Sequence, residues 1–558
     1  MTRRFPVTLL ALLVCLTAAA PAQEPSFARM KKDFGREFQS KDLNTRVAAI
    51  KRLAGHGHPE AVRYFLDVIK KTNGALTQAR NEWAEATAER ATLRREVRNL
   101  KSLVSNGKIG KKKLERAEAK LKVVSAKAAE YSKTITRDAD IERTLRQAVG
   151  WVVQNCSDHH KRDAGRIIRT TYAGARGIDD KADLLRIMVW VDIPELAEIV
   201  AKEVEHREAP TRVAALRAIE ERGGKRALML AKSRMKDEAW QVRAQAIRIL
   251  RKVGGKEAAE ALTAALENED GRLITDAMSA LKKLTGQNFH DNVHLWRDWL
   301  AKNGDQLPEP TESENAAPER PAVAEGGGRG RGRGRPRNGG GSGGQKAGHG
   351  TGFYGINTTS KHIVYVIDYS GSMSAPLAGG RRGGGGGGGM QGGSGPAKIG
   401  GKRKVDGVAT ELLKSIDSLP KDGTFNVVLF NSGVVLWRKK MQKADRANKD
   451  AIRKWVLSRG PAGSTDLFGG VEQGFKFAGR GSFDKYYRSV VDTIFLLSDG
   501  SPTAGRIQAT GQILREVRAM NDLRRIALHC VGLGRSINVR FLSRLAREND
   551  GEFVHITR

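Results

Sequence analysis

Cysteine is almost absent from this sequence. Only Cys15, Cys156 and Cys530 occur among 558 residues. The last two lie in regions that we assign to different domains, so we expect no disulfide framework. Aromatic residues make up only 6% of the chain. Beyond residue 22 no apolar stretch approaches the ~20 residues that a membrane-spanning helix needs, so we do not expect an integral membrane protein.

Acidic residues are also far fewer than basic residues. Lys and Arg number 97 against 62 Asp and Glu, which gives a formal net charge of +35. Such an excess attracts acidic surfaces, among them nucleic acid, anionic polymers of the cell envelope, lipid headgroups and acidic proteins. Charge alone does not choose among these partners.

The first residues have the pattern of an export signal. Arg3 and Arg4 precede an apolar segment, 7–20, and small residues lead to Ala22. This order predicts a signal peptide over residues 1–22, cleaved after Ala22, and hence a protein exported to the periplasm, the cell surface or the medium. An uncleaved anchor, a lipoprotein signal around 12–15 and twin-arginine export remain alternatives.

Residues 26–301 have apolar residues at helical spacing, broken by short Gly and Pro turns. One sequence motif is repeated, with Ala215, Ala246 and Ala277 at a constant spacing of 31 residues. Repetition at such a period is typical of a helical solenoid, and the pattern resembles HEAT repeats. A last helix with Trp296 and Trp299 would close the stack. An ordinary helical bundle is the alternative.

Residues 75–136 interrupt this pattern. Apolar residues fall on alternating three- and four-residue steps on both sides of a Gly/Asn break at 106–110, and only Arg90 is out of place. The pattern predicts an antiparallel coiled-coil hairpin inserted in the solenoid. Lysines at 108 and 111–113 would lie at its tip, either solvated or in contact with an anionic partner.

A cysteine and two histidines lie close together after this hairpin, at Cys156, His159 and His160, with Asp158 between them. The spacing matches no zinc pattern. We therefore expect a capped helix terminus here and no metal site.

Residues 302–350 are predicted to be a disordered linker. A Pro/Glu-rich part precedes the segment GGGRGRGRGRPRNGGGSGGQKAGHG. Such composition buries no core. Arg/Gly segments bind nucleic acid with the help of stacking aromatics, which are missing here, so we favour a charged tether and do not expect a nucleic-acid partner.

Residues 353–558 alternate strand and helix patterns. We expect strands at 362–368, 424–431, 434–441, 493–498, 525–532 and 552–557, with helices between them. This order predicts an α/β doubly wound, Rossmann-like domain. The whole chain is then multidomain, with an all-α solenoid before the α/β domain. A Gly-rich insertion at 374–404 interrupts the α/β domain.

Oxygen-bearing side chains follow two buried strands of this domain. Asp368, Ser370 and Ser372 end the first strand in D-x-S-x-S spacing, Asp499 ends a later strand, and Thr465 lies in a loop between them. Ligands bind beyond the carboxyl ends of the strands in open α/β sheets. A site of hard oxygen donors without His or Cys selects Mg²⁺, Mn²⁺ or Ca²⁺.

These pieces in this order resemble the metal-ion-dependent adhesion site (MIDAS) of von Willebrand factor type A domains. The resemblance covers about Phe353 to Arg558. It implies that Ser370, Ser372 and Thr465 bind the metal directly and that Asp368 and Asp499 act largely through water. A free coordination position would accept an acidic side chain of a partner protein. Each piece alone is also compatible with a Ser/Gly turn or a capped strand end.

We therefore expect a non-catalytic protein that binds an exposed Asp or Glu of a partner protein through a divalent cation. No His lies near Ser370 or Ser372 in the sequence to activate a hydroxyl, and His362, His529 and His555 are predicted strand residues. Two alternatives stay open. One is an accessory subunit of an ATPase-driven remodelling or metal-insertion complex, and the other is a polyanion binder acting through the basic segments.

Overall fold

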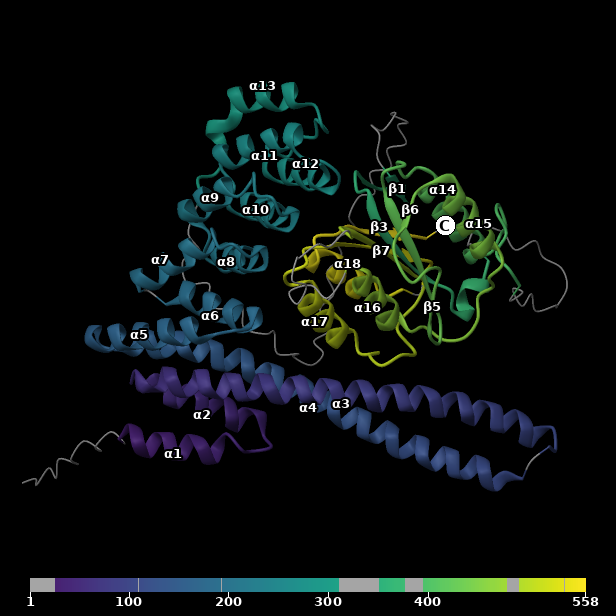
Figure 1. The fold of residues 1–558 in the computed structure, drawn as a ribbon, viewed down its shortest axis with the longest axis horizontal. Coiled ribbons are helices and arrows are strands. Elements are labelled where there is room, and N and C mark those ends of the chain that lie inside the picture. The colour runs from purple at the N-terminus through teal and green to yellow at the C-terminus, as the bar shows by residue number, and fades with distance from the viewer. Residues whose placement is uncertain are drawn as a thin grey trace, which may run out of the picture.

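The computed structural model describes residues 26–310, 351–376, 395–478 and 491–557, except Ile109, Asp192 and Ser536. The predicted signal peptide, most of the predicted linker and most of the Gly-rich insertion lie outside the described residues. Figure 1 shows a helical part and an α/β part beside each other.

The helical part stacks short helices in pairs. They are α1 (Phe27–Glu37), α2 (Leu43–Gly55), α5 (Asp158–Gly174), α6 (Ile178–Trp190), α7 (Pro194–Glu203), α8 (Ala209–Arg222), α9 (Gly224–Ser233), α10 (Trp240–Val253), α11 (Lys256–Asn268), α12 (Arg272–Thr285) and α13 (Val293–Asn303). A 3₁₀ turn, η1 (Gly304–Gln306), follows α13.

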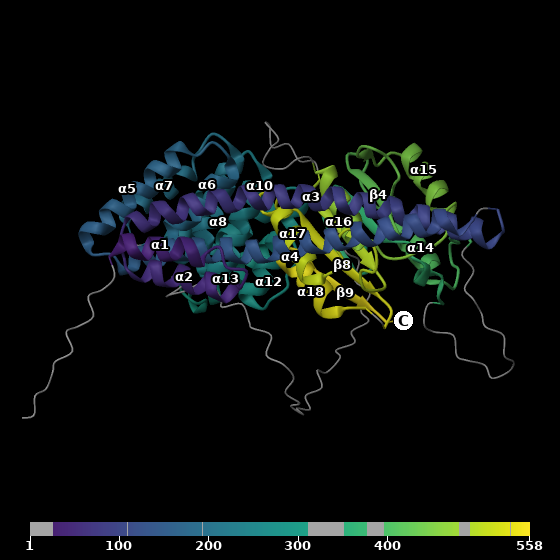
Figure 2. The same ribbon diagram turned by 90° about the horizontal axis from the view of Figure 1, so that it is seen from below.

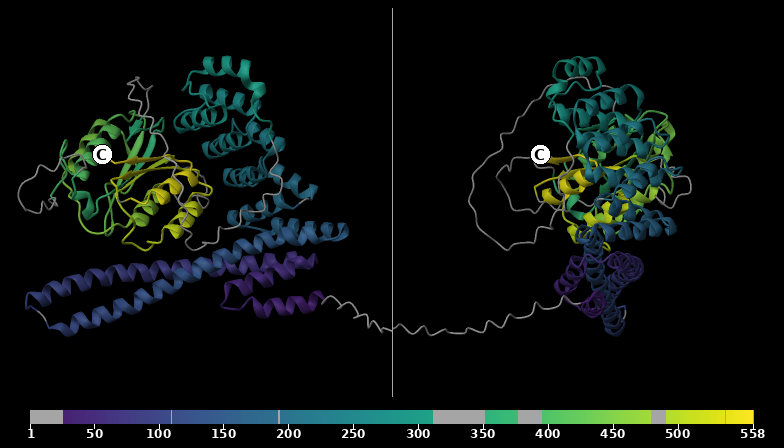
Figure 3. Two further views of the ribbon diagram at one scale, coloured as in Figure 1. Left: turned by 180° about the vertical axis from the view of Figure 1, so that it is seen from behind. Right: turned by 90° about the vertical axis from the view of Figure 1, so that its left-hand side faces the viewer.

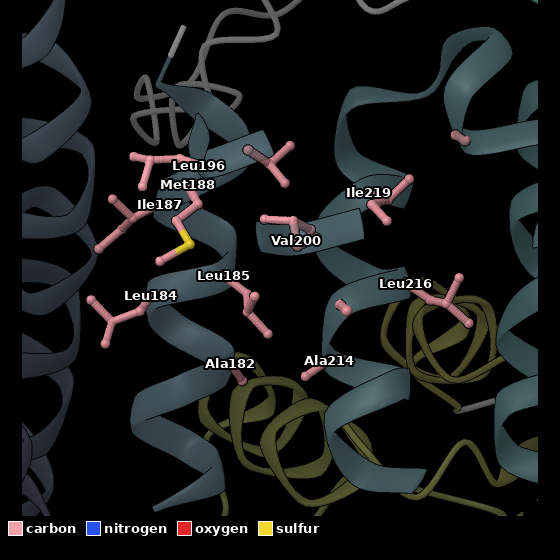
Figure 4. Close-up of a cluster of buried hydrophobic side chains, with 14 of the residues drawn as sticks. Ala182, Leu184, Leu185, Ile187, Met188, Leu196, Val200, Ala214, Leu216 and Ile219 are labelled. Atoms are coloured by element: carbon pink, nitrogen blue, oxygen red, sulfur yellow. The ribbon is translucent and has the colours of Figure 1, made fainter. Parts of the chain in front are cut away.

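The 31-residue spacing marks equivalent positions in this stack. Ala215, Ala246 and Ala277 lie on α8, α10 and α12, and each is 0% exposed. Small buried residues allow neighbouring helices to approach closely, and branched residues fill the space around them, as Figure 4 shows for α6, α7 and α8. Trp296 of α13 is fully buried, and its indole N–H donates to the His290 carbonyl at 2.8 Å. The predicted HEAT-like solenoid is confirmed.

A long helical hairpin projects from the solenoid. It consists of α3 (Glu60–Ser105) and α4 (Lys111–Asn155), which pack along each other and run beneath the α/β part (Figure 2). The hairpin was predicted over residues 75–136, but α3 already begins at Glu60. It is continuous through Asn73 and Gly74, because one glycine costs a helix only about 1 kcal/mol.

The capped helix terminus predicted near Cys156 is the start of α5. Ser157 caps α5 by accepting from the His160 amide at 3.4 Å. The Cys156 thiol is buried and donates to the Gly57 carbonyl at 2.9 Å. Among the described residues, no helix is both long and apolar enough to cross a membrane.

The α/β part contains a small hairpin and a larger sheet. Its strands are β1 (Thr351–Phe353), β2 (Ile356–Thr358), β3 (His362–Asp368), β4 (Thr424–Phe430), β5 (Val434–Leu436), β6 (Gln442–Lys443), β7 (Thr493–Ser498), β8 (Ala527–Leu533) and β9 (Phe553–Ile556). The main sheet has the order β5-β4-β3-β7-β8-β9, with β6 also paired to β4. Strands β4, β3, β7, β8 and β9 are parallel, whereas β5 and β6 pair antiparallel to β4.

One predicted strand is much shorter than expected. The pattern over 434–441 predicted a long partner for β4, but β5 ends at Leu436. The buried Asn426 side chain donates to the carbonyls of Arg438 and Lys440, at 3.0 and 2.9 Å. These bonds take carbonyls that a continued ladder would use, and the chain rejoins β4 only at β6.

Helices cover both faces of the sheet. Helices α14 (Lys404–Asp417) and α15 (Arg446–Leu457) lie on one face, and α16 (Leu467–Phe477), α17 (Thr510–Asn521) and α18 (Val539–Glu548) lie on the other. Alternate residues of β3 serve the two cores, with Val364 and Val366 in one and Ile363 and Tyr365 in the other. The predicted doubly wound, Rossmann-like fold is confirmed.

The two parts are docked together, although a tether between them was predicted. The α/β part lies in the angle between the solenoid and the helical hairpin, as Figure 1 and the left view of Figure 3 show. Trp83 of α3 is 3% exposed and belongs to the core that α16 and α17 share. The guanidinium of Arg506 lies 5.0 Å from the centre of its ring, within cation–π range.

Candidate metal centre

The candidate site lies where the strand order reverses. β3 has β4 on one side and β7 on the other, and all three are parallel. Crevices form at such points beyond the carboxyl ends of the strands. Asp368 ends β3, and Asp499 directly follows β7. The fold therefore brings these two carboxylates to the same edge.

Both carboxylate oxygens of Asp368 accept hydrogen bonds. Its side chain is 0% exposed. Oδ1 accepts from the Ser370 amide at 2.9 Å, and Oδ2 accepts from the Ser498 hydroxyl at 2.8 Å. Burial raises the pKa of Asp368 to about 6, and the neighbouring Asp499 adds to this shift. The carboxylate is fixed at the floor of the site, where a cation would offset the cost of its charge.

A chain of hydrogen bonds joins both serines to the second carboxylate. The hydroxyls of Ser370 and Ser372 are 3.0 Å apart, and the Ser372 hydroxyl donates to Asp499 Oδ1 at 2.7 Å. Both serines lie at the start of a 3₁₀ turn, η2 (Gly371–Ser374), which folds the backbone over the end of β3. Ser370 is buried and Ser372 is exposed, so the site opens to solvent at Ser372.

The loop that carries Thr465 lies directly against this turn. The Gly371 amide donates to the Gly463 carbonyl at 2.9 Å, and the Ala462 amide donates to the Tyr369 carbonyl at 2.9 Å. Thr465 is 5% exposed, and its amide donates to the Thr503 hydroxyl at 3.0 Å. Its own hydroxyl takes no part in the hydrogen-bonded chain above, as far as the described residues show.

A lysine that the sequence analysis did not single out completes the cluster. Lys404 begins α14, and its ammonium group lies 2.7 Å from Asp499 Oδ2. The Lys404 amide donates to the Ala375 carbonyl at 2.9 Å, which closes the base of the Gly-rich insertion beside the site. Most of that insertion lies outside the described residues.

The downstream end of the insertion is fixed by Asp406. Its carboxylate accepts from the amides of Lys398 and Arg403, at 2.9 and 3.0 Å. The Arg403 guanidinium in turn lies 2.7 Å from Asp406 Oδ1. These bonds hold the first turn of α14, and therefore Lys404, in place.

The donor set is compatible with a hard divalent cation. Two carboxylates and two serine hydroxyls converge, and an ammonium group already lies against Asp499, so the site attracts positive charge. The described residues contain no group of three or more His, Cys, Asp or Glu that could hold a metal. Two carboxylates together with serine hydroxyls still form a set of hard oxygen donors, whose chemistry suits Mg²⁺, Mn²⁺ or Ca²⁺.

Sequence reasoning missed two members of the cluster. Ser498, which fixes Asp368, directly precedes Asp499, so its place at the strand end was a usable signal. Lys404 is 95 residues from Asp499 and follows the insertion, and no local pattern pointed to it.

Two known families match parts of this chain. Residues 404–554 match the family of von Willebrand factor type A domains, and residues 193–282 match HEAT repeats. These matches agree with the α/β part and the solenoid.

Individual relatives match about a third of this chain. The inter-alpha-trypsin inhibitor heavy chain H1 of Sus scrofa is 31% identical over 200 residues, which is 35% of this chain and 19% of that protein. Heavy chain H3 of Mesocricetus auratus is 28% identical over 199 residues, 35% of this chain and 19% of that one. This chain thus spans about a fifth of the length of these relatives. A von Willebrand factor type A protein from Catenulispora acidiphila aligns with 36% of this chain and 40% of its own, at 18% identity and a TM-score of 0.27.

Proposed function

We propose that this chain, which belongs to the von Willebrand factor type A proteins through residues 404–554 and carries HEAT repeats before that domain, is an exported, non-catalytic binding protein. It binds an exposed Asp or Glu of a partner protein at the end of β3 through a divalent cation. The proposed export rests on the signal-peptide pattern of residues 1–22.

The observation that carries this proposal is the hydrogen-bonded chain from Ser370 through Ser372 to Asp499. Three side chains from two strand ends are already in contact, so little conformational entropy is lost when they gather around a ligand. Ser370, Ser372 and Thr465 would hold the cation directly, with Asp368 and Asp499 behind them. A bound cation would supply an electrophilic centre for a partner carboxylate, because hydroxyl ligands neutralise little of its charge.

The surroundings of the serines support binding over catalysis. A serine nucleophile needs a base within hydrogen-bond reach. Among the described residues, Ser372 donates to Asp499 and no histidine hydrogen-bonds to either serine. His529 is 5% exposed, and its Nδ1 accepts from the Glu552 amide at 3.0 Å, so it is part of the core.

A capture experiment tests the proposal. Residues 23–558 are immobilised and incubated with envelope extract in Mg²⁺, in EDTA, and in Mg²⁺ with raised salt. The Ser370→Ala/Ser372→Ala double variant is compared with Ser464→Ala, which removes an exposed hydroxyl one residue before Thr465. We expect the same partners with the wild type and Ser464→Ala in Mg²⁺, and their loss in EDTA and with the double variant.

Partners that persist in EDTA but leave in moderate salt would contradict the proposal. Such behaviour is typical of polyanion binding through the basic segments, because that binding depends on salt and is indifferent to chelators.

A further inference from the structure

A cavity of about 200 Å³ lies at the seam between the solenoid and the α/β part. The solenoid contributes Arg217 of α8 and Arg248 of α10. The α/β part contributes Arg518, Arg525 and Arg547 from α17, the turn before β8, and α18. Figure 1 shows α17 and α18 facing these solenoid helices. The cavity belongs to neither part alone.

The lining has an excess of positive charge. Arg248 and Arg525 pair with Asp550, which lies outside the lining. The lining itself has five arginines and two carboxylates, Asp522 and Glu548. Both carboxylates already have cationic partners. Asp522 is shared between Arg217 and Arg186, the latter at 2.8 Å, and Glu548 lies 2.6 Å from Arg544.

The arginines at the mouth have no such compensation. Arg518 and Arg547 are both exposed and form no ion pair with any residue that the structure describes. Two guanidinium groups from different helices thus remain free at the opening.

The arginines at the back are buried. The side chain of Arg217 is 13% exposed and that of Arg525 is 7% exposed. The Arg525 guanidinium pairs with Asp550, yet its Nε is buried without a hydrogen-bond partner. Burial and the neighbouring arginines Arg186 and Arg525 lower the pKa of Arg217 well below its usual range. Because arginine stays protonated in proteins, Arg217 keeps its charge in the cavity wall at a cost in desolvation.

We propose that this cavity binds a small polyanion that carries phosphate groups, at the level of a diphosphate, and that the anion bridges the two parts. The excess of three positive charges in the lining suits a multiply charged anion better than a single carboxylate. Phosphoryl oxygens project in several directions and accept from guanidinium groups that approach from opposite walls, whereas a carboxylate accepts mainly in one plane. This proposal is independent of the metal centre.

Calorimetric titration of residues 23–558 with sodium pyrophosphate tests it, at constant ionic strength and without divalent metal. We expect one saturable site and at least tenfold weaker binding by Arg518→Gln/Arg547→Gln. The matched control is Arg98→Gln/Arg540→Gln, which removes two exposed arginines that do not line the cavity and is expected to bind like the wild type. The Ser370→Ala/Ser372→Ala variant is also expected to bind normally.

Titrations with two further ligands test which chemical group of the anion the cavity recognises. Citrate of similar charge should bind at least tenfold more weakly than pyrophosphate. ADP that binds more tightly than pyrophosphate would identify a nucleotide as the source of the diphosphate, and weaker binding would favour a free polyphosphate. The proposal is wrong if pyrophosphate shows no saturable binding, if both double variants lose it equally, or if citrate binds as well.

Discussion

We expect the ammonium group of Lys404 to compete with a metal ion at the candidate centre. Replacing Lys404 should therefore increase the affinity of the centre for the metal. Its ammonium group lies 2.7 Å from Asp499 Oδ2, with side chains 17% and 0% exposed. A hydrogen bond to a charged group contributes about 1.5–3 kcal/mol. A divalent cation competes with Lys404 for the carboxylate of Asp499. Each ~1.4 kcal/mol of binding free energy changes the affinity tenfold. Lys404→Gln should therefore bind Mg²⁺ about 10- to 100-fold more tightly.

The variant should also lose stability without metal. Removing one partner of a buried ion pair leaves an uncompensated charge and costs about 3–5 kcal/mol. We expect a lower thermal unfolding midpoint in EDTA and a larger increase on adding Mg²⁺ than in the wild type. Magnesium titration by calorimetry measures the affinity, with the exposed Lys402→Gln as the control of equal charge change. Unchanged or weaker Mg²⁺ binding by Lys404→Gln would refute this reasoning.

Two further predictions concern the core and the seam. Asp550 pairs with Arg248 across the seam and with Arg525 of its own part, with 8% of its side chain exposed. Asp550→Asn should destabilise the folded chain by about 3–5 kcal/mol, seen in urea unfolding, and should increase the radius of gyration in X-ray scattering. Neither change is expected if the docking does not depend on this carboxylate. Burial, with a smaller contribution from Arg272, lowers the pKa of His529 to about 3. Because this folded-state pKa lies below the unfolded value of about 6.5, the unfolded state binds the proton first, and stability falls as the pH drops below 6.5. The wild type should lose about 1 kcal/mol more than His529→Gln between pH 6.5 and 5.5, and about 1.4 kcal/mol over the next pH unit. Parallel pH profiles of the two proteins would contradict this assignment.

Local patterns were sufficient to predict most of the α/β part. β3 and β7 have the predicted bounds, because continuous β-branched and aromatic runs ended by polar residues leave little choice of strand limits. The same runs placed Asp368 and Asp499 at strand ends, and parallel pairing then brings the two together. The early end of β5 depends on the side chain of Asn426, which a period-two pattern does not reveal.

Contacts between distant segments were not predictable in this way. Arg90 was a single mismatch in the heptad pattern of α3, and the structure shows it donating to the Gly505 carbonyl at 3.0 Å. The mismatch therefore marked the docking surface, but its partner is 415 residues away. Arg217 and Asp522 are likewise paired across the seam, and nothing in either local sequence connects them.

The central claim is that hydroxyls from two loops hold a divalent cation at the end of β3. Its most direct test is titration of the chain with MgCl₂, comparing Thr465→Ala with Ser464→Ala. Thr465 is 5% exposed beside the turn that carries both serines, whereas Ser464 is exposed. We predict one Mg²⁺ site in the wild type and in Ser464→Ala, and its loss in Thr465→Ala. Equal Mg²⁺ binding by all three proteins, or none by the wild type, would contradict the claim.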